Sequence, residues 1–393
     1  EAKKIFAQHR SHDLYLCFGG DIEELIDELL NRPTGCAGGM GGSASIHSPA
    51  IGMVGHDGHM GTQVPIADGY ALGSKEKTLA IMGDASAEEG YVLGALGEGA
   101  SKKLPILFVC TDNGLSVLTK LEVRRSWRAV DEAQAKGLPA IDISDNPWLI
   151  MSWINELKKQ LPAFMNIHVC RELWHAGTGC DGPPEWNRFE LTKKELSKIE
   201  LEKESDVIEE ETMNYVQAAW EKRLKAEVKM SVIVKNTELP NPYDIKFSKE
   251  NPDKLNCAQT ISLITKDHLL KGNGLALGQC LTAVGWVGGT VPELTQEDGL
   301  VELSMDDTSG NYIAVGCALA GRRPVFIVRY QGFQWFDAAG IANYAAKSKE
   351  LWNIPCPVFV RSIGMDGGIG PVASNSHHGI FMRLPGIPIC APM

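Results

Sequence analysis

Two polar side chains follow apolar runs that predict neighbouring parallel strands. Asp84 comes directly after the run TLAIMG, and Asn113 follows LPILFVC. The carboxyl ends of parallel strands lie at one edge of a sheet, where α/β proteins bind their ligands. A carboxylate and an amide oxygen there suit Mg²⁺, which prefers oxygen ligands and often binds together with phosphates. We therefore predict a magnesium site, although Gly-Asp after a strand is also a common helix N-cap.

The stretch between these two residues predicts the element that positions them. SAEEGYVLGALGEGASKK, which starts at Ser86, is long enough for a helix and lies between the two apolar runs. Strand, helix and strand form a βαβ unit, which returns the chain to the same sheet edge. A helix N-terminus near Ala85 would favour an anion at this edge. The predicted site therefore suits a metal ion and a phosphate group together.

Apolar runs alternate with helical stretches along the whole chain, which predicts an α/β fold class. NIHVC indicates another inner strand in the first half. A Lys- and Glu-rich stretch at 201–255 predicts a charged helix and then a linker. From Cys257 a second α/β pattern begins, with a predicted helix and then the apolar runs GLALG, IAVGCALAG, PVFIVRY, PCPVFVRS and IPICAPM. We predict two doubly wound, mostly parallel-sheet domains, at 1–200 and 256–393, because 393 residues exceed one compact core.

Bulk composition excludes some classes of partner. The formal net charge of −11 argues against nucleic acid or an acidic membrane surface. No apolar run approaches the roughly 20 residues that span a bilayer. Ten cysteines without a CxxC pair indicate reduced thiols, and so the cytoplasm or an organelle matrix. The chain begins with Glu1 rather than Met, so an upstream targeting segment stays open.

Three motifs surround the predicted metal site. GCAGGMGGSASIH runs from Gly35 to His47, GHDGHMGTQVPIADGYAL follows it, and HRSH lies near the start of the chain. Together they resemble the alpha subunit of thiamine diphosphate-dependent 2-oxo acid dehydrogenases, over most of residues 5–120. That family combines a basic HR-type motif with TGC-x-x-G-x-GGS, G-x-x-x-G-x-QVP and a GDG…NN motif. The resemblance implies domains of the thiamine diphosphate-binding fold.

The resemblance also implies a role for each matching residue. Asp84 and Asn113 would bind Mg²⁺ together with the backbone carbonyl of Leu115. The implied cofactor-binding residues are His9, Arg10, Gly58, Met60, Gly83, Ala85 and Ser86. His175, in ELWHAGTG, resembles the active-site histidine of the family, although a surface-loop histidine would look the same. Ala85 replaces the usual second glycine of GDG, which should cost little unless the backbone there needs positive φ.

The second half resembles the beta subunit of the same enzymes, over NYIAVGCALAGRRPVFIVRYQGFQWFDAAGIANYAAKSKE. Counted from IAVG, the catalytic glutamate of the family falls on Asp307, and the aromatic residue that packs on the aminopyrimidine falls on Phe333. Without the motif, Phe333 could equally be a core aromatic. The acid would donate a hydrogen bond to the far ring nitrogen of the aminopyrimidine and so activate the thiazolium carbon. Aspartate is one methylene shorter than glutamate, and the adjacent Asp306 could take its place.

The second half also departs from the family. Gln279 and Cys280 stand where the beta subunit has an acidic pair. SNSHHGIFMRLPG contains the expected histidine, which would be His377 or His378, but the stretch that follows is shorter than in the family. The chain ends at Met393, where the family begins a third domain. That domain is expected to be absent or to belong to another chain.

These observations predict a thiamine diphosphate- and Mg²⁺-dependent enzyme that decarboxylates a 2-oxo acid and transfers the acyl unit, with a lipoyl acyltransferase as a candidate partner. The alternative enzyme is a transketolase-like ketol transferase acting on a ketose, which fits DNGLS and SHHG. A catalytically silent subunit is the third reading, motivated by Asp307, Gln279 and the missing third domain. Because the family shares each cofactor site between subunits, we expect a homodimer or a larger homo-oligomer.

Overall fold

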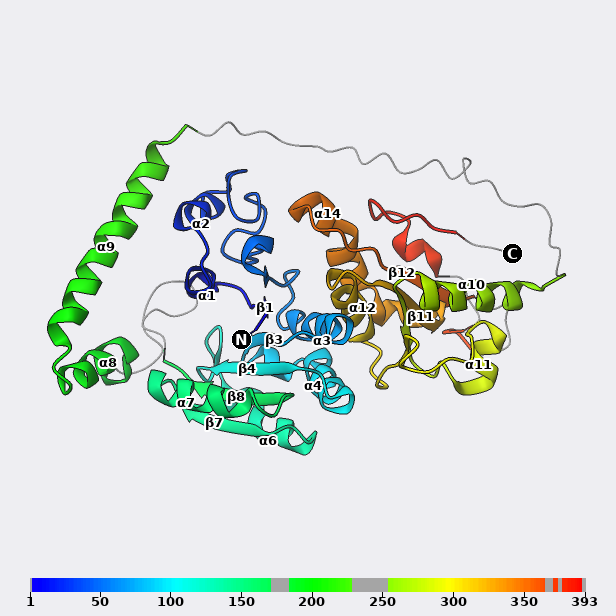
Figure 1. Ribbon diagram of the computed structural model, residues 1–393, viewed down its shortest axis with the longest axis horizontal. Coiled ribbons are helices and arrows are strands. Elements are labelled where there is room, and N and C mark those ends of the chain that lie inside the picture. The colour runs from blue at the N-terminus through cyan, green and yellow to red at the C-terminus, as the bar shows by residue number, and fades with distance from the viewer. Residues whose placement is uncertain (1, 171–183, 228–253, 365–369, 374–376, 391–393) are drawn as a thin grey trace. The chain divides into compact units, whose positions relative to one another are not determined.

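The computed structural model describes residues 2–170, 184–227, 254–364, 370–373 and 377–390 (Figure 1). The chain divides into two compact units. The first contains Glu1–Asp68 and Lys75–Ser231, and the second contains Gly69–Ser74 and Val232–Met393. The finer division at residues 200 and 255 remains a prediction. Among the described residues, no helix is long and apolar enough to cross a membrane.

The first unit contains a six-stranded sheet in the order β2-β1-β3-β4-β8-β7. Its strands are β1 Lys4–Phe6, β2 Met53–Val54, β3 Thr78–Gly83, β4 Ile106–Asp112, β7 Ala140–Ser144 and β8 Ala163–His168. Every neighbouring pair is parallel. The run TLAIMG is β3 as predicted, and the inner strand predicted at NIHVC is β8, which lies between β4 and β7.

Helices and short connections accompany these strands along the chain. The helices are α1 His12–Cys17, α2 Ile22–Leu29, α3 Gln63–Ser74, α4 Gly90–Lys102, α5 Leu121–Arg124, α6 Ala129–Ala135, α7 Pro147–Leu157, α8 Arg188–Ser197 and α9 Glu202–Lys225. A hairpin of β5 Leu115–Ser116 and β6 Thr119–Lys120 follows β4. The predicted charged helix is α9, whose Ala219 packs against Ile22 and Ile26 of α2.

One predicted helix starts later than expected. The stretch from Ser86 to Glu88 forms a 3-10 turn, η2, and Glu89 is extended with ψ 135° before α4 begins at Gly90. The Glu88 carboxylate forms ion pairs with Arg124 and Arg125, which hold this turn outside the helix. A 3-10 turn therefore begins at the position where we predicted the helix to start, near Ala85, and the α-helix itself begins at Gly90.

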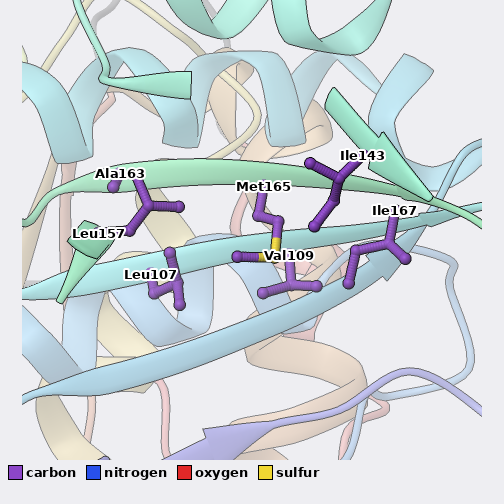
Figure 2. Close-up of a cluster of buried hydrophobic side chains, with 7 residues drawn as sticks. All are labelled: Leu107, Val109, Ile143, Leu157, Ala163, Met165 and Ile167. Carbon is purple, nitrogen blue, oxygen red and sulfur yellow. The ribbon is translucent and has the colours of Figure 1, made fainter. Parts of the chain in front are cut away.

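Alternate residues of β4 and β8 bury one face of the sheet. The cluster consists of Leu107, Val109, Ile143, Leu157, Ala163, Met165 and Ile167 (Figure 2). Successive side chains of a strand point to opposite faces, so residues two apart share this core. Each large apolar side chain that is fully buried contributes roughly 1.5–3 kcal/mol. This packing holds β4 firmly, and with it the residues that follow its carboxyl end.

The second unit contains a four-stranded parallel sheet in the order β10-β9-β11-β12. Its strands are β9 Gly274–Gly278, β10 Leu300–Glu302, β11 Arg323–Tyr330 and β12 Phe359–Ile363. Its helices are α10 Cys257–Lys271, α11 Ala283–Gly289, α12 Gly310–Leu319, α13 Gln334–Asp337 and α14 Ala346–Trp352, with short turns at Gln331–Phe333 (η5), Ile341–Ala345 (η6) and His378–Phe381 (η7). IAVGCALAG lies in α12, as the family motif implies.

The predicted last strand is not present in the described part of its sequence. IPICAPM was expected to be a strand like PVFIVRY, but residues 387–390 have no strand. Pro388 interrupts this run, and a proline cannot donate a hydrogen bond to a sheet. The strand β10, by contrast, lies in a stretch for which we predicted no strand.

Two carboxyl groups lie side by side in the core of the first unit. Asp68 of α3 is 0% exposed and Glu98 of α4 is 1% exposed. Neither carboxyl oxygen of Asp68 has a hydrogen-bond partner among the described residues. Burial raises the pKa of Asp68 well above its usual range, and the charge of Glu98 raises it further. Asp68 is therefore protonated in the folded chain at pH values where it is ionised in the unfolded chain.

We expect Asp68→Asn to stabilise the chain at neutral pH, by on the order of 1 kcal/mol. A raised carboxyl pKa means that stability is greatest below the unfolded value of about 3.9 and falls as the pH rises toward the folded value. Urea denaturation at pH 5 and pH 8 should therefore show a larger loss of stability in the wild type than in Asp68→Asn. Asp13→Asn, at an exposed position, is the control. Equal pH dependence in wild type and Asp68→Asn would contradict this reading.

Candidate functional site

Gln8 connects the end of β1 to the turn that follows β3. Its Oε1 accepts hydrogen bonds from the backbone N–H of Gly83 at 2.9 Å and from the Oγ of Ser86 at 2.7 Å. A Cβ added at Gly83 would lie 3.0 Å from the Gln8 amide, so a glycine suits this close approach. Sequence reasoning missed Gln8, although it directly precedes HRSH and follows an apolar run.

Asp84 follows β3 directly and is 3% exposed. Arg124 lies between two carboxylates, with its Nη2 2.5 Å from Asp84 Oδ2 and its Nη1 2.5 Å from Glu88 Oε1. Burial raises the pKa of Asp84, while the hydrogen bond from Arg124 acts in the opposite direction. Asp112, at the end of β4, raises that pKa as well. Asp84 is thus a buried carboxyl group in contact with a cation.

The end of β4 brings the other predicted metal residues to the same edge. Gly83 pairs with Thr111 in the register of β3 and β4, so Asp84 and Asn113 both follow paired positions. Asp112 Oδ1 accepts a hydrogen bond from Gly114 N at 2.9 Å, which shapes the turn into β5. Leu115 is the first residue of β5. The three predicted metal residues therefore meet at the carboxyl edge of adjacent strands.

This edge fits a divalent cation that prefers oxygen. Three carboxylates, of Asp84, Glu88 and Asp112, are in contact with two arginines, Arg124 and Arg125. The excess of negative charge favours a further cation. Within the described part of the chain, no cluster of three or more His, Cys, Asp or Glu residues could hold a metal. A metal here would therefore need amide and carbonyl oxygens beside one carboxylate, which is a donor set that Mg²⁺ accepts.

The loop of Gly58 to Gly61 is held against the turn that contains Asp84. Gly58 and Gly61 have φ values of +111° and +86°, which favour glycine. A Cβ at Gly61 would lie 3.3 Å from the Cβ of Ser86, so the two turns are in close contact. Tyr91 Oη donates a hydrogen bond of 2.6 Å to the Met60 carbonyl. Met60 itself is 37% exposed and remains accessible to a ligand.

His56 presents a buried donor beside His9. The two rings pack edge to face, with centroids 5.6 Å apart. His56 Nδ1 accepts a hydrogen bond from Gly58 N at 2.9 Å, and burial lowers the pKa of His56. A neutral ring that accepts at Nδ1 carries its proton on Nε2. A backbone hydrogen bond with Ala44 also acts on this ring and raises its pKa against the effect of burial.

Arg10 and Ala85 have contrasting backbone conformations. Arg10 has φ +64°, and its N–H donates to the Ser43 carbonyl at 2.8 Å, which ties it to the glycine-rich loop. Ala85 has φ −68° and ψ −35°, an ordinary right-handed conformation. As predicted, alanine therefore replaces the usual glycine of the family without backbone strain.

The second unit contains a cavity of about 290 Å³ at the carboxyl ends of its strands. It is lined by Gln279, Cys280, Leu303, Met305, Asp307, Gly310, Phe326, Ile327, Val328, Arg329, Phe333 and Asp337. Most of its wall is apolar, and three charged side chains, of Asp307, Arg329 and Asp337, reach it. An apolar cavity with a few converging polar groups is typical of a small-molecule site.

The cavity distinguishes between the two candidate acids. Asp307 lines it together with Phe333. Asp306 does not line it, because Asp306 Oδ1 accepts hydrogen bonds from the N–H and the Oγ1 of Thr308, at 2.9 and 2.6 Å. Gln279 and Cys280, which replace the acidic pair of the family, also line the cavity. The geometry therefore favours Asp307 as the acid that a ligand would meet.

The histidines differ in how far the structure describes them. His377 Nδ1 accepts a hydrogen bond from Trp335 Nε1 at 3.0 Å, and its N–H donates to Gln331 Oε1 at 2.6 Å. His377 is outside the cavity lining. His175 lies outside the described residues.

Sequence reasoning missed Asp337, although it belongs to the aromatic-rich motif FQWFDAAG.

Comparison with known proteins is consistent with the geometry of the first unit. Residues 1–151 match the family model of the dehydrogenase E1 component. The alpha-1 subunit of mitochondrial pyruvate dehydrogenase E1 from rice (Oryza sativa) is 35% identical over 130 residues, 32% of this chain and 32% of that protein. The alpha subunit from Zymomonas mobilis is 32% identical over 143 residues, 35% of this chain and 40% of that protein. The matched part of the chain spans 32 and 40% of the lengths of these two relatives.

Solved structures match a larger part of the chain. Transketolase from Campylobacter jejuni has a TM-score of 0.67 at 16% identity, over 98% of this chain and 65% of that chain. A transketolase mutant from Pichia stipitis has a TM-score of 0.57 at 14% identity, over 85% and 57% of the two chains. Such low identity shows the fold alone, which is the predicted α/β fold of thiamine diphosphate-binding proteins. The predicted resemblance to the alpha subunit of 2-oxo acid dehydrogenases is therefore confirmed for residues 1–151.

Proposed function

We propose that this chain is a thiamine diphosphate- and Mg²⁺-dependent enzyme that decarboxylates a 2-oxo acid and transfers the acyl unit. The observation that carries the proposal is the meeting of Asp84 and Asn113 at the ends of β3 and β4. This edge lies within residues 1–151, the part that matches the dehydrogenase E1 component. When bound, the cofactor would supply an electron sink for carbon–carbon cleavage, and the protein would supply binding and orientation.

The first unit would bind the metal and the diphosphate. Asp84, Asn113 and the carbonyl of Leu115 would coordinate Mg²⁺, and the cation would replace Arg124 at the Asp84 carboxylate. The remaining proposed contacts to the cofactor are His9, Arg10, Gly58, Met60, Gly83, Ala85 and Ser86.

The second unit would bind the aminopyrimidine ring. Phe333 would pack against the ring, and Asp307 would donate a hydrogen bond to its far nitrogen. Both residues line the same cavity, which supports this assignment. His175 and His377 remain proposed catalytic residues. The Nε2 of His377 is buried and has no hydrogen-bond partner among the described residues.

The acceptor and the assembly belong to the same proposal. We propose a lipoyl group of an acyltransferase as the acceptor, and a homodimer or larger assembly with shared sites. The cytoplasm or an organelle matrix remains the predicted compartment. A ketol transferase acting on a ketose is the second candidate, because the transketolase fold extends over 98% of this chain. A catalytically silent subunit is the third.

One experiment separates these functions. The full chain, with thiamine diphosphate, Mg²⁺ and a dye acceptor, is offered a panel of 2-oxo acids and sugar phosphates. We expect carbon dioxide release and dye reduction with at least one 2-oxo acid. Ketol transfer between sugar phosphates without carbon dioxide would favour the second candidate. Cofactor binding with no turnover on the whole panel would favour the silent subunit and contradict the proposal.

Replacing the proposed metal carboxylate should remove cofactor binding. In Asp84→Ala the Mg²⁺ site loses its one proposed carboxylate, so thiamine diphosphate should no longer bind at detectable affinity by calorimetry. Asp131→Ala, which removes an exposed carboxylate on α6, is the matched control and should bind as the wild type does. Unchanged affinity in a folded Asp84→Ala variant would refute the site.

Substitution of Asp307 should impair activation of the cofactor while leaving its binding intact. Binding would depend mainly on Mg²⁺, the diphosphate contacts and Phe333, whereas activation would depend on the hydrogen bond from Asp307. Asp307→Ala should lose about 10²–10⁴-fold in activity, the usual contribution of a positioned acid, and still bind thiamine diphosphate. The rate of proton exchange at the thiazolium carbon of the bound cofactor measures the activation directly. Exchange at the wild-type rate in this variant would exclude Asp307 as the activating acid.

A further inference from the structure

Asp337 is a second carboxyl group in the cavity of the second unit. It is the last residue of α13, is 7% exposed, and lines the same cavity as Asp307 and Phe333. The roles proposed above do not use it. The family resemblance gave no reason to single it out. Its burial beside another acid therefore needs a physical explanation.

The buried side chain of Asn311, on α12, fixes one oxygen of Asp337. Asn311 Oδ1 accepts a hydrogen bond from the N–H of Gly340 at 2.6 Å, so its amide nitrogen must face the other way. That Nδ2 donates to the Thr308 carbonyl at 2.9 Å and to Asp337 Oδ1 at 3.3 Å. Because Asp337 Oδ1 is an acceptor, a proton on this carboxyl group belongs on Oδ2.

The surroundings of Asp337 favour its protonated form. Burial raises the pKa of Asp337 well above its usual range, against the hydrogen bonds from Asn311, and the charges of Asp307 and Asp306 raise it further. Among the residues that line the cavity, Arg329 is the cation. One positive charge balances one ionised carboxyl group, and a second ionised carboxyl group would be unbalanced in an apolar cavity.

We propose that Asp337 is a positioning residue that shares one proton with Asp307 and so keeps a neutral carboxylic acid in this cavity. The pair holds one proton and one negative charge, and no proton is gained or lost overall. Because Asp307 is one methylene shorter than the glutamate of the family, a second acid beside it would keep a hydrogen-bond donor available. The role in catalysis rests on the proposed function, whereas the shared proton does not.

The shared proton can be measured without the cofactor. The full chain is labelled with ¹³C-aspartate, and its carboxyl signals are followed by NMR as the pH is raised. The Asp337 signal is the one that Asp337→Asn removes, and Asp337→Glu identifies the site if that variant does not fold. We expect this signal to titrate above the usual value of about 3.9, and to move to lower pH in Asp307→Asn. Asp267→Asn, an exposed position on α10, should leave it unchanged.

A second measurement tests the consequence for activation. Asp337→Asn should bind thiamine diphosphate as tightly as the wild type and slow proton exchange at the thiazolium carbon by about tenfold or more. The inference is overturned if the Asp337 signal titrates near 3.9, if Asp307→Asn does not move it, or if exchange is unchanged in Asp337→Asn. Failure of the wild type to bind thiamine diphosphate would instead overturn the proposed function. The titration would still show whether Asp337 and Asp307 share a proton.

Discussion

The parallel register of β3 and β4 is the constraint on which the first site depends. Gly83 lies opposite Thr111, so the chain leaves both strands at the same edge and delivers Asp84 and Asn113 there. The apolar core of Figure 2 holds that register, because a shift by one residue would turn its side chains to the opposite face. Gln8 then fixes the turn after β3 to the end of β1. A sheet edge with an excess of carboxylates is the result.

The second unit positions its acidic residues in an apolar cavity, whereas the first unit positions them at a charged sheet edge. Gly310 allows close packing, since a Cβ there would lie 2.8 Å from Phe326 and 3.6 Å from Asp337 Oδ1. Asn311, the next residue, links α12 to both Asp337 and Gly340. The first two residues of α12, Gly310 and Asn311, therefore both pack against the cavity lining and orient Asp337 within the cavity. Acids placed where water is scarce remain neutral more easily, which suits them to donate hydrogen bonds.

Continuous apolar runs made the central strands predictable, and β3 and β9 occupy the expected residues. The motifs likewise placed Asp84 and Phe333 at a sheet edge and in a cavity. The features that we did not predict correctly depend on contacts with residues that are distant in sequence. The start of α4 at Gly90 follows from the pairing of Glu88 with Arg124, 36 residues away, which no local pattern shows. Asp337 was missed for the same reason, because its environment is created by Asn311 from another helix.

We propose that the edge at Asp84 binds the Mg²⁺ and the diphosphate of thiamine diphosphate, and that the cavity at Asp307 binds its aminopyrimidine ring. A crystal structure of the full chain grown with thiamine diphosphate and Mg²⁺ tests it most directly. The account predicts the metal and diphosphate on Asp84 and Asn113, with Arg124 displaced from Asp84, and the pyrimidine ring against Phe333 within hydrogen-bond reach of Asp307. Cofactor bound elsewhere, while Arg124 still pairs with Asp84, would contradict it.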